Sequence, residues 1–262
     1  MAAHAPLLQA RGLTLAFGGV RAIEGVSFEV RRGEVLSIIG PNGAGKSSLL
    51  NVISGVYAPQ GGSLAWEGQV QRRYTAHRVA RLGLARTFQN LALFKGMSVL
   101  DNVLAGRTLH LRSRWWAHAV RWPAARREER EQRRRAEALL GFVGLAAWRD
   151  VPVGQLAYGL QKRVELARAL AAEPELLLLD EPMAGMGVDD KLALSACIVE
   201  ANRVHGTTVV LIEHDMGVVM DLSDRIVVLD HGRKIADGPP DVVRRDPAVL
   251  AAYLGRAGAA AH

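Results

Sequence analysis

The sequence Gly40-Pro41-Asn42-Gly43-Ala44-Gly45-Lys46-Ser47 lies between an apolar run, residues 35–39, and a segment with helical character, residues 46–54. It follows the pattern G-x-x-x-x-G-K-S, whose glycines let successive backbone N–H groups turn toward the oxygen atoms of a phosphate. A strand before the loop and a helix after it add the positive end of a helix dipole. The stretch therefore predicts a phosphate-binding loop rather than a chance glycine turn. In such a loop Lys46 reaches the β- and γ-phosphates, and the Ser47 hydroxyl binds Mg²⁺.

A pair of acids follows a second apolar run. Residues 176–179 are four leucines, and Asp180 and Glu181 come directly after them. A parallel strand presents its carboxyl end at the ligand crevice, where Asp180 can hold Mg²⁺. Glu181 points elsewhere and can take a proton from a water molecule that attacks the γ-phosphate. The alternative is that both acids only cap the next helix.

The wider pattern indicates an α/β protein. Continuous apolar runs at residues 35–39, 176–179 and 207–212 are typical of strands buried on both faces, as in a parallel sheet covered by helices. Residues 7–30 and 63–70 resemble antiparallel strands, and residues 91–156 are predicted to form a helical insertion. We expect a hairpin that turns at His231-Gly232 and a short C-terminal tail.

Composition sets broad limits. The 262 residues are 49% hydrophobic and 23% charged, which is ordinary for a globular protein with a core. Cys197 is the single cysteine, so an internal disulfide is excluded and a reducing compartment is expected. We find neither a signal peptide nor an apolar run of about 18 residues, and we expect a soluble or peripheral protein. A net charge of +7 suits nucleic acid, anionic membrane or phosphate ligands without choosing among them.

Three further strings carry a resemblance to the ABC-type ATPases, over nearly the whole chain. Residues 156–161 resemble the signature, residues 86–89 the Q-loop, and residues 211–215 the switch region. The resemblance implies a P-loop NTPase (RecA-like) core with a small antiparallel β subdomain and an inserted helical subdomain. It also implies ATP as substrate and Mg²⁺ as cofactor.

The same resemblance assigns roles to single residues. Gln89 contacts Mg²⁺ and water, His214 senses the γ-phosphate, and Phe17 stacks on adenine. The predicted catalytic residues are Glu181 and His214, and the predicted metal ligands are Ser47, Gln89 and Asp180. The predicted ATP-binding residues are Phe17, Gly40, Pro41, Asn42, Gly43, Ala44, Gly45, Lys46, Ser47, Ser48 and Gln89. The signature residues expected to contact a partner's ATP are Ala157, Tyr158, Gly159 and Leu160.

The resemblance implies one ABC ATPase domain over residues 7–256. Its core comprises residues 7–90 and 157–240, its helical signature subdomain residues 91–156, and its C-terminal tail residues 241–262. The signature departs from the common form Leu-Ser-Gly-Gly-Gln, since alanine, tyrosine and leucine stand at residues 157, 158 and 160. Gly187 stands where the D-loop usually has Asp or Asn. These departures concern a composite site shared with a second subunit.

Within the family, the chain is similar to the larger ATP-binding subunit of branched-chain amino acid importers. The strings at residues 156–159, 180–186, 211–216, 223–226 and 252–255 carry this similarity. It implies a heterodimer of two ATPases, with a homodimer as the alternative, beneath two membrane permease subunits. A periplasmic solute-binding protein acts indirectly, the location is the cytoplasmic face of the inner membrane, and nucleic acid is not expected.

Two questions stay open at this point. Residues 107–135 hold ten arginines against three glutamates, with Trp115, Trp116 and Trp122 among them. This segment is a docking or lipid-facing edge, a solvated charged face, or a nucleic-acid contact. The alternative functions are a soluble ABC ATPase in DNA repair or translation, and a small-molecule kinase that uses the same loop.

Overall fold

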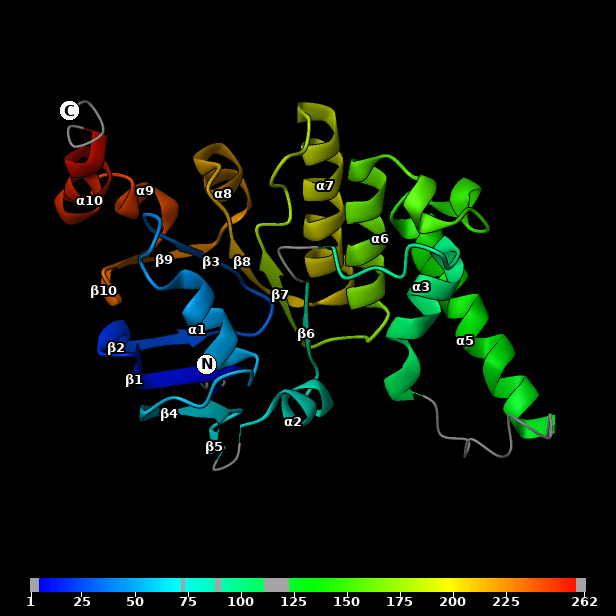
Figure 1. The fold of residues 1–262 in the computed structure, drawn as a ribbon, viewed down its shortest axis with the longest axis horizontal. Coiled ribbons are helices and arrows are strands. Elements are labelled where there is room, and N and C mark those ends of the chain that lie inside the picture. Colours follow the sequence, from blue (N-terminus) through cyan, green and yellow to red (C-terminus); the bar gives the residue numbers. More distant parts are fainter. Residues whose placement is uncertain (1–4, 72–73, 88–90, 111–122, 258–262) are drawn as a thin grey trace. The chain divides into compact units, whose positions relative to one another are not determined.

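The structure is a computed structural model that describes residues 5–71, 74–87, 91–110 and 123–257. The chain divides into two compact units, described separately below (Figure 1). The first comprises Met1–Arg86, Glu175–Pro182 and Val199–His262, and the second comprises Thr87–Pro174 and Met183–Ile198. The predicted helical subdomain, residues 91–156, lies inside the second unit. The predictions for Gln89 and for the tryptophans at 115, 116 and 122 lie outside the described residues.

The first unit contains the predicted parallel sheet. Within the described ranges it has six strands in the order β10-β9-β3-β8-β7-β6. The strands are β3 (Val35–Ile39), β6 (Leu84–Arg86), β7 (Leu176–Asp180), β8 (Thr208–Ile212), β9 (Arg225–Asp230) and β10 (Arg233–Gly238). Every residue of β3, β7 and β8 is buried, because a parallel sheet is covered on both faces. The prediction from the apolar runs is thus confirmed.

Strand order explains why distant motifs meet. The pairs β3–β8, β7–β8 and β6–β7 are all parallel, so the strands end at one edge of the sheet. The glycine loop leaves this edge after β3, Asp180 ends β7 with Glu181 just after it, and Glu213 follows β8. β9 and β10 form the antiparallel hairpin that turns at His231-Gly232, as predicted.

A four-stranded antiparallel sheet completes the β structure of the described first unit, in the order β2-β1-β4-β5. Its strands are β1 (Leu8–Phe17), β2 (Val20–Val30), β4 (Gly61–Trp66) and β5 (Gln69–Val70). The helices of this unit are α1 (Lys46–Ile53), α2 (Ala76–Arg81), α8 (Met216–Leu222), α9 (Pro240–Val243) and α10 (Pro247–Ala257). Leu13, Ile23 and Leu50 share one buried cluster with Leu178, so α1 is packed between the two sheets (Figure 1).

The second unit is helical. It contains α3 (Val99–Gly106), η1 (Thr108–His110), α5 (Pro123–Phe142), η2 (Ala146–Trp148), η3 (Val153–Gln155) and α6 (Tyr158–Leu170). The unit boundary falls within α7 (Val188–His205). α6 begins at Tyr158, so the signature itself forms the first turn of the helix, and Ala157 before it has a non-helical backbone (φ −59°, ψ 151°).

The basic segment is partly held by ion pairs. Arg107 is 2% exposed, and its guanidinium donates to the Ala171 carbonyl at 3.0 Å. On α5, Arg135 lies 2.9 Å from Glu131 and 2.9 Å from Glu173. These contacts show that several of the charges on and beside α5 are paired. The lipid-facing role of this segment stays a prediction. No helix within the described ranges is long and apolar enough to cross a bilayer.

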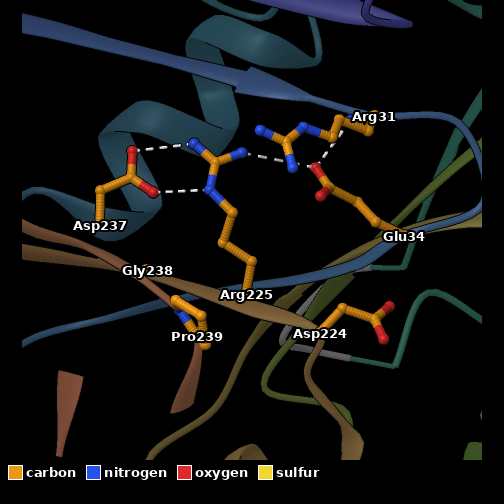
Figure 2. Close-up of a pocket in the computed structure, with 7 residues that line it drawn as sticks. All are labelled: Arg31, Glu34, Asp224, Arg225, Asp237, Gly238 and Pro239. Carbon is orange, nitrogen blue, oxygen red and sulfur yellow. Dashed lines mark hydrogen bonds and ion pairs between the residues drawn. The ribbon is translucent and has the colours of Figure 1, made fainter. Parts of the chain in front are cut away.

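A charged pocket lies at the open end of the β9–β10 hairpin, opposite its turn (Figure 2). Its centre is Arg225, which donates to both carboxylate oxygens of Asp237 at 2.6 and 2.9 Å and lies 3.8 Å from Glu34. Lys234 adds a contact to Asp237 at 2.8 Å. The pocket is lined by Arg31, Glu34, Asp224, Arg225, Asp237, Gly238 and Pro239. Both partners of the central pair are mostly buried, at 15% and 17% exposure.

This network predicts a stability effect that depends on pH. Burial alone would raise the pKa of Asp237, but hydrogen bonds from Arg225 and Lys234 outweigh it and hold that pKa below 3.8. The carboxylate therefore contributes stability above pH 3.8, which is lost as the pH falls through the lower pKa of the folded state. Asp237→Asn should lower the free energy of unfolding by about 1–3 kcal/mol at pH 7, and by less below the folded-state pKa. Denaturant unfolding over a pH series measures this.

Asp221→Asn is the matched control for that measurement, because it removes the same charge from an exposed position on α8. It should leave the unfolding free energy near the wild-type value at every pH. An equal loss for both variants, or a loss for Asp237→Asn that does not shrink in acid, would contradict the assigned pairing.

Candidate functional site

The glycine loop is shaped by contacts that exclude side chains. Gly40 has φ +151°, and a Cβ there would lie 2.1 Å from the Leu229 carbonyl oxygen. Gly45 has φ +100°, and a Cβ there would lie 2.3 Å from the Ala22 carbonyl oxygen. Both positions combine a backbone conformation that L-residues resist with a close backbone neighbour. The loop is thus held from outside by the β9–β10 hairpin and by β2.

Lys46 closes the loop from inside. It is 6% exposed, and its ammonium donates to the carbonyl oxygens of Gly40 at 2.8 Å and Pro41 at 3.1 Å. α1 begins at this lysine, and Gly45 before it has no side chain to cap the first turn. The N-terminus of a helix and a buried cation therefore lie together, which is a setting for an anion. Ser47 is exposed and Ser48 half-buried.

Asp180 ends β7 and is held by an arginine. Its Oδ2 accepts from Arg86 Nη2 at 2.9 Å, and both side chains are nearly buried, at 6% and 8% exposure. Arg86 also donates through Nη1 to Asn51 Oδ1 and to Ser54 Oγ, each at 2.8 Å. Sequence reasoning missed this role of Arg86. The only signal was its position three residues before Gln89, at the end of a short strand.

Glu181 turns away from its neighbour, as predicted. Its backbone has φ +49°, an uncommon conformation for a residue with a side chain. Its Oε1 lies 2.7 Å from His214 Nε2, and the two side chains are 15% and 45% exposed. Asp215 caps α8 by accepting from the amides of Gly217 and Val218, which anchors the segment that carries His214. Strain at Glu181 and a fixed His214 bring a carboxylate and an imidazole together.

An exposed aromatic pair lies at the end of β1. Phe17 is 46% exposed, Tyr57 is 38% exposed, and their ring centroids are 5.3 Å apart at an interplanar angle of 68°. Two large exposed rings in edge-to-face contact offer an apolar face to a flat ligand. Tyr57 was not predicted, because it follows α1 in a turn and belongs to no motif.

The signature lies in the second unit, against the D-loop of the same chain. Tyr158 Oη donates to the Ala184 carbonyl at 3.3 Å. A Cβ on Gly159 would lie 2.2 Å from Asp190 Oδ2, and Arg163 lies 3.6 Å from the same carboxylate. A side chain at residue 159 would therefore displace the Asp190 carboxylate from its present position. Ala157 precedes α6 in an extended conformation.

Comparison with known proteins identifies the family. Residues 23–184 match the family model described as ABC transporter. Residues 233–259 match the model described as branched-chain amino acid ATP-binding cassette transporter. These two matches span the glycine loop, Asp180 and Glu181, the strand β10 and the helices α9 and α10.

Curated relatives match over nearly their full length. The high-affinity branched-chain amino acid transport ATP-binding protein BraF of Pseudomonas aeruginosa is 43% identical over 96% of this chain and 99% of the relative. The corresponding protein LivG of Escherichia coli is 40% identical over the same shares.

Solved structures agree in fold. A nucleotide-free ATP-binding cassette from an ABC transporter superposes with TM-score 0.81 at 30% identity, covering 95% of this chain and 98% of the other. The ADP conformation of an ATP-binding cassette gives TM-score 0.82 at 30% identity, covering 95% and 99%. With the glycine loop, the acids of β7 and the Glu181–His214 pair in place, the chain belongs to the ABC transporter family, as an ATP-hydrolysing ATP-binding protein similar to those of branched-chain amino acid transport.

Proposed function

We propose that this protein hydrolyses ATP to drive the import of branched-chain amino acids or related small solutes. The glycine loop closed by Lys46 carries the proposal for the ATPase, and the two relatives named for branched-chain amino acid transport support the solute. A soluble ABC ATPase of DNA repair or translation is not favoured, because those relatives match this chain almost from end to end. The acceptor pocket that a small-molecule kinase needs has no candidate among the motifs found.

The residues present fit a triphosphate with its cation. The loop excludes side chains at Gly40 and Gly45, and the Lys46 ammonium faces its interior. The Ser47 hydroxyl and the Asp180 carboxylate supply hard oxygen ligands, which Mg²⁺ prefers. When bound, Mg²⁺ neutralises phosphate charge during phosphoryl transfer. The amides of the loop and Lys46 orient the β- and γ-phosphates, while Phe17 and Tyr57 offer their rings to adenine.

Glu181 and His214 carry the proposed chemistry. A water molecule that attacks the γ-phosphate must lose a proton, and the Glu181 carboxylate accepts it. His214 Nε2, 2.7 Å from Glu181 Oε1, keeps that carboxylate oriented before the substrate is engaged. His214 can also donate to a γ-phosphate oxygen, and it thereby reports whether that group is still attached. Gln89 remains a predicted contact to Mg²⁺ and water.

The signature is proposed to serve a second subunit. Ala157 lacks the hydroxyl of the common signature, so the N–H groups and helix dipole at the start of α6 supply the contact to the partner's ATP. Tyr158 joins this turn to the D-loop of the same chain through the Ala184 carbonyl, and Arg163 joins it to Asp190 on α7. We propose that the chain pairs with a second ATPase, as a heterodimer in preference to a homodimer. This pair would work with two membrane permeases at the cytoplasmic face of the membrane.

Uptake measurements test the transport role. Cells that lack this gene should lose most uptake of radiolabelled leucine, isoleucine and valine at low micromolar concentration, while glutamate uptake stays normal. Wild-type protein should restore uptake, and Glu181→Gln should not, because transport needs repeated hydrolysis. Unchanged uptake of all three amino acids would overturn the solute assignment. Purified protein whose ATPase responds to DNA or ribosomes rather than to permease-bearing membranes would overturn the transport role.

A further inference from the structure

Arg86 joins three parts of the first unit through one buried guanidinium. It ends β6, its Nη2 holds Asp180 on β7, and its Nη1 donates to Asn51 Oδ1 and Ser54 Oγ. Asn51 belongs to α1, and Ser54 follows its last residue. Because α1 begins at Lys46, the same guanidinium contacts both the helix that starts at the glycine loop and the acid at the end of β7.

The geometry restricts the carboxylate. A guanidinium is planar, and its acceptors Asn51 on α1 and Ser54 just after that helix fix the plane in which Nη2 points at Asp180. The Asp180 Oδ2 atom accepts the charge-assisted hydrogen bond at 2.9 Å, so the rotation of the carboxylate is set relative to α1. A lysine at this position would offer one nitrogen and could not hold the same plane.

The pair is poorly explained by stability alone. Side-chain exposures of 8% and 6% mean that both charges have lost most of their hydration. Apolar residues of similar volume often stabilise such a position as well as an ion pair does, or better. Arg225 with Asp237 forms a comparable pair in the same unit, at 15% and 17% exposure, and that pair braces a hairpin away from the glycine loop (Figure 2).

We propose that Arg86 is a positioning residue for magnesium: it holds the Asp180 carboxylate at a set orientation to α1, so that the protein binds ATP with Mg²⁺ more tightly than ATP alone. This inference rests on the magnesium site proposed above. The guanidinium acts through Asp180. Outer hydrogen-bond partners of metal-binding carboxylates typically change metal affinity by about 10- to 100-fold when removed.

Equilibrium binding tests the proposal without turnover. Affinity for a non-hydrolysable ATP analogue is measured with Mg²⁺ and with EDTA, in wild type, Arg86→Gln, Arg86→Lys and the control Arg225→Gln. Arg86→Gln should reduce the gain in affinity on adding Mg²⁺ by about 10- to 100-fold and leave the affinity in EDTA unchanged. In Arg86→Lys the gain in affinity on adding Mg²⁺ should lie between those of Arg86→Gln and wild type, because lysine keeps the positive charge but lacks the planar guanidinium. Arg225→Gln should lower the thermal midpoint and keep the full magnesium effect.

Each outcome decides one point. A full magnesium effect in Arg86→Gln would show that the residue is only structural and would overturn the inference. Should Arg86→Gln fail to fold, Arg86→Lys and Asn51→Ala, which removes one anchor of the guanidinium, carry the same test. A loss of affinity as large in EDTA as with Mg²⁺ would also overturn it. Wild-type protein that binds the analogue equally with and without Mg²⁺ would instead refute the magnesium site of the proposed function.

Discussion

Glu181→Gln is expected to slow ATP hydrolysis by about 10²- to 10⁴-fold, the usual contribution of a general base, while ATP still binds. The amide has the shape of the carboxylate and cannot accept the proton of the attacking water. The left-handed backbone at φ +49° and the 2.7 Å contact to His214 Nε2 both act on this one side chain. A protein that holds a glutamate in this way should lose its chemistry and keep its binding loop when the carboxylate is replaced.

Single-turnover hydrolysis and equilibrium ATP binding, measured on the same preparation, separate the two effects. Glu175→Gln is the matched control, because Glu175 stands just before β7, at the other end of that strand, in an exposed pair with Arg32. Exposed pairs contribute little, so this variant should hydrolyse ATP at the wild-type rate. A wild-type rate of hydrolysis in Glu181→Gln would contradict the assignment of Glu181 as the general base.

Lys46→Ala is expected to weaken ATP binding by about 10- to 100-fold, because a buried charged donor to the phosphates is worth about 1.5–3 kcal/mol. The structure adds a second reason. The ammonium also donates to the carbonyl oxygens of Gly40 and Pro41, at 2.8 and 3.1 Å. Its removal therefore also removes these two hydrogen bonds within the loop. We expect the loss at the level of affinity, unlike the loss in Glu181→Gln.

Isothermal titration with a non-hydrolysable analogue measures this change directly. Lys95→Ala removes the same charge from an exposed position in the second unit and should bind as wild type. It therefore separates the specific contact from the loss of one positive charge overall. Unchanged affinity in Lys46→Ala would contradict the assignment of the loop as the phosphate site.

Much of the site followed from local patterns. The glycines of residues 40–45 could be recognised because a phosphate loop takes backbone conformations that residues with a Cβ resist. Gly40 and Gly45 do lie where a Cβ would meet a carbonyl oxygen. The pair Asp180–Glu181 was readable because carboxylates directly after an apolar strand lie at its carboxyl end. Phe17, His214 and the signature came from family resemblance, and their isolated residue types would not have distinguished them.

Other parts could not be read. Tyr57 completes an aromatic pair with Phe17 across 40 residues of sequence, and its turn carries no motif. Arg86 looked like one of many arginines, since its three acceptors are on elements 32 to 94 residues away. The start of α6 at Tyr158 carries no capping signal, since Ala157 before it has a non-helical backbone (ψ 151°) and makes no side-chain hydrogen bond that caps the helix. The predicted domain boundaries stay a prediction.

The sequence by itself determined the buried strands, the glycine loop and the hairpin at His231-Gly232, because burial on both faces and positive φ restrict which residues a short segment can hold. Only the tertiary structure decided which charges meet. Glu181 faces His214 and Asp180 faces Arg86 because β7 lies between β8 and β6, and this strand order is set by packing of the whole sheet rather than by any segment. Side chains on neighbouring strands touch only after that order is chosen, and short-range patterns carry no record of it.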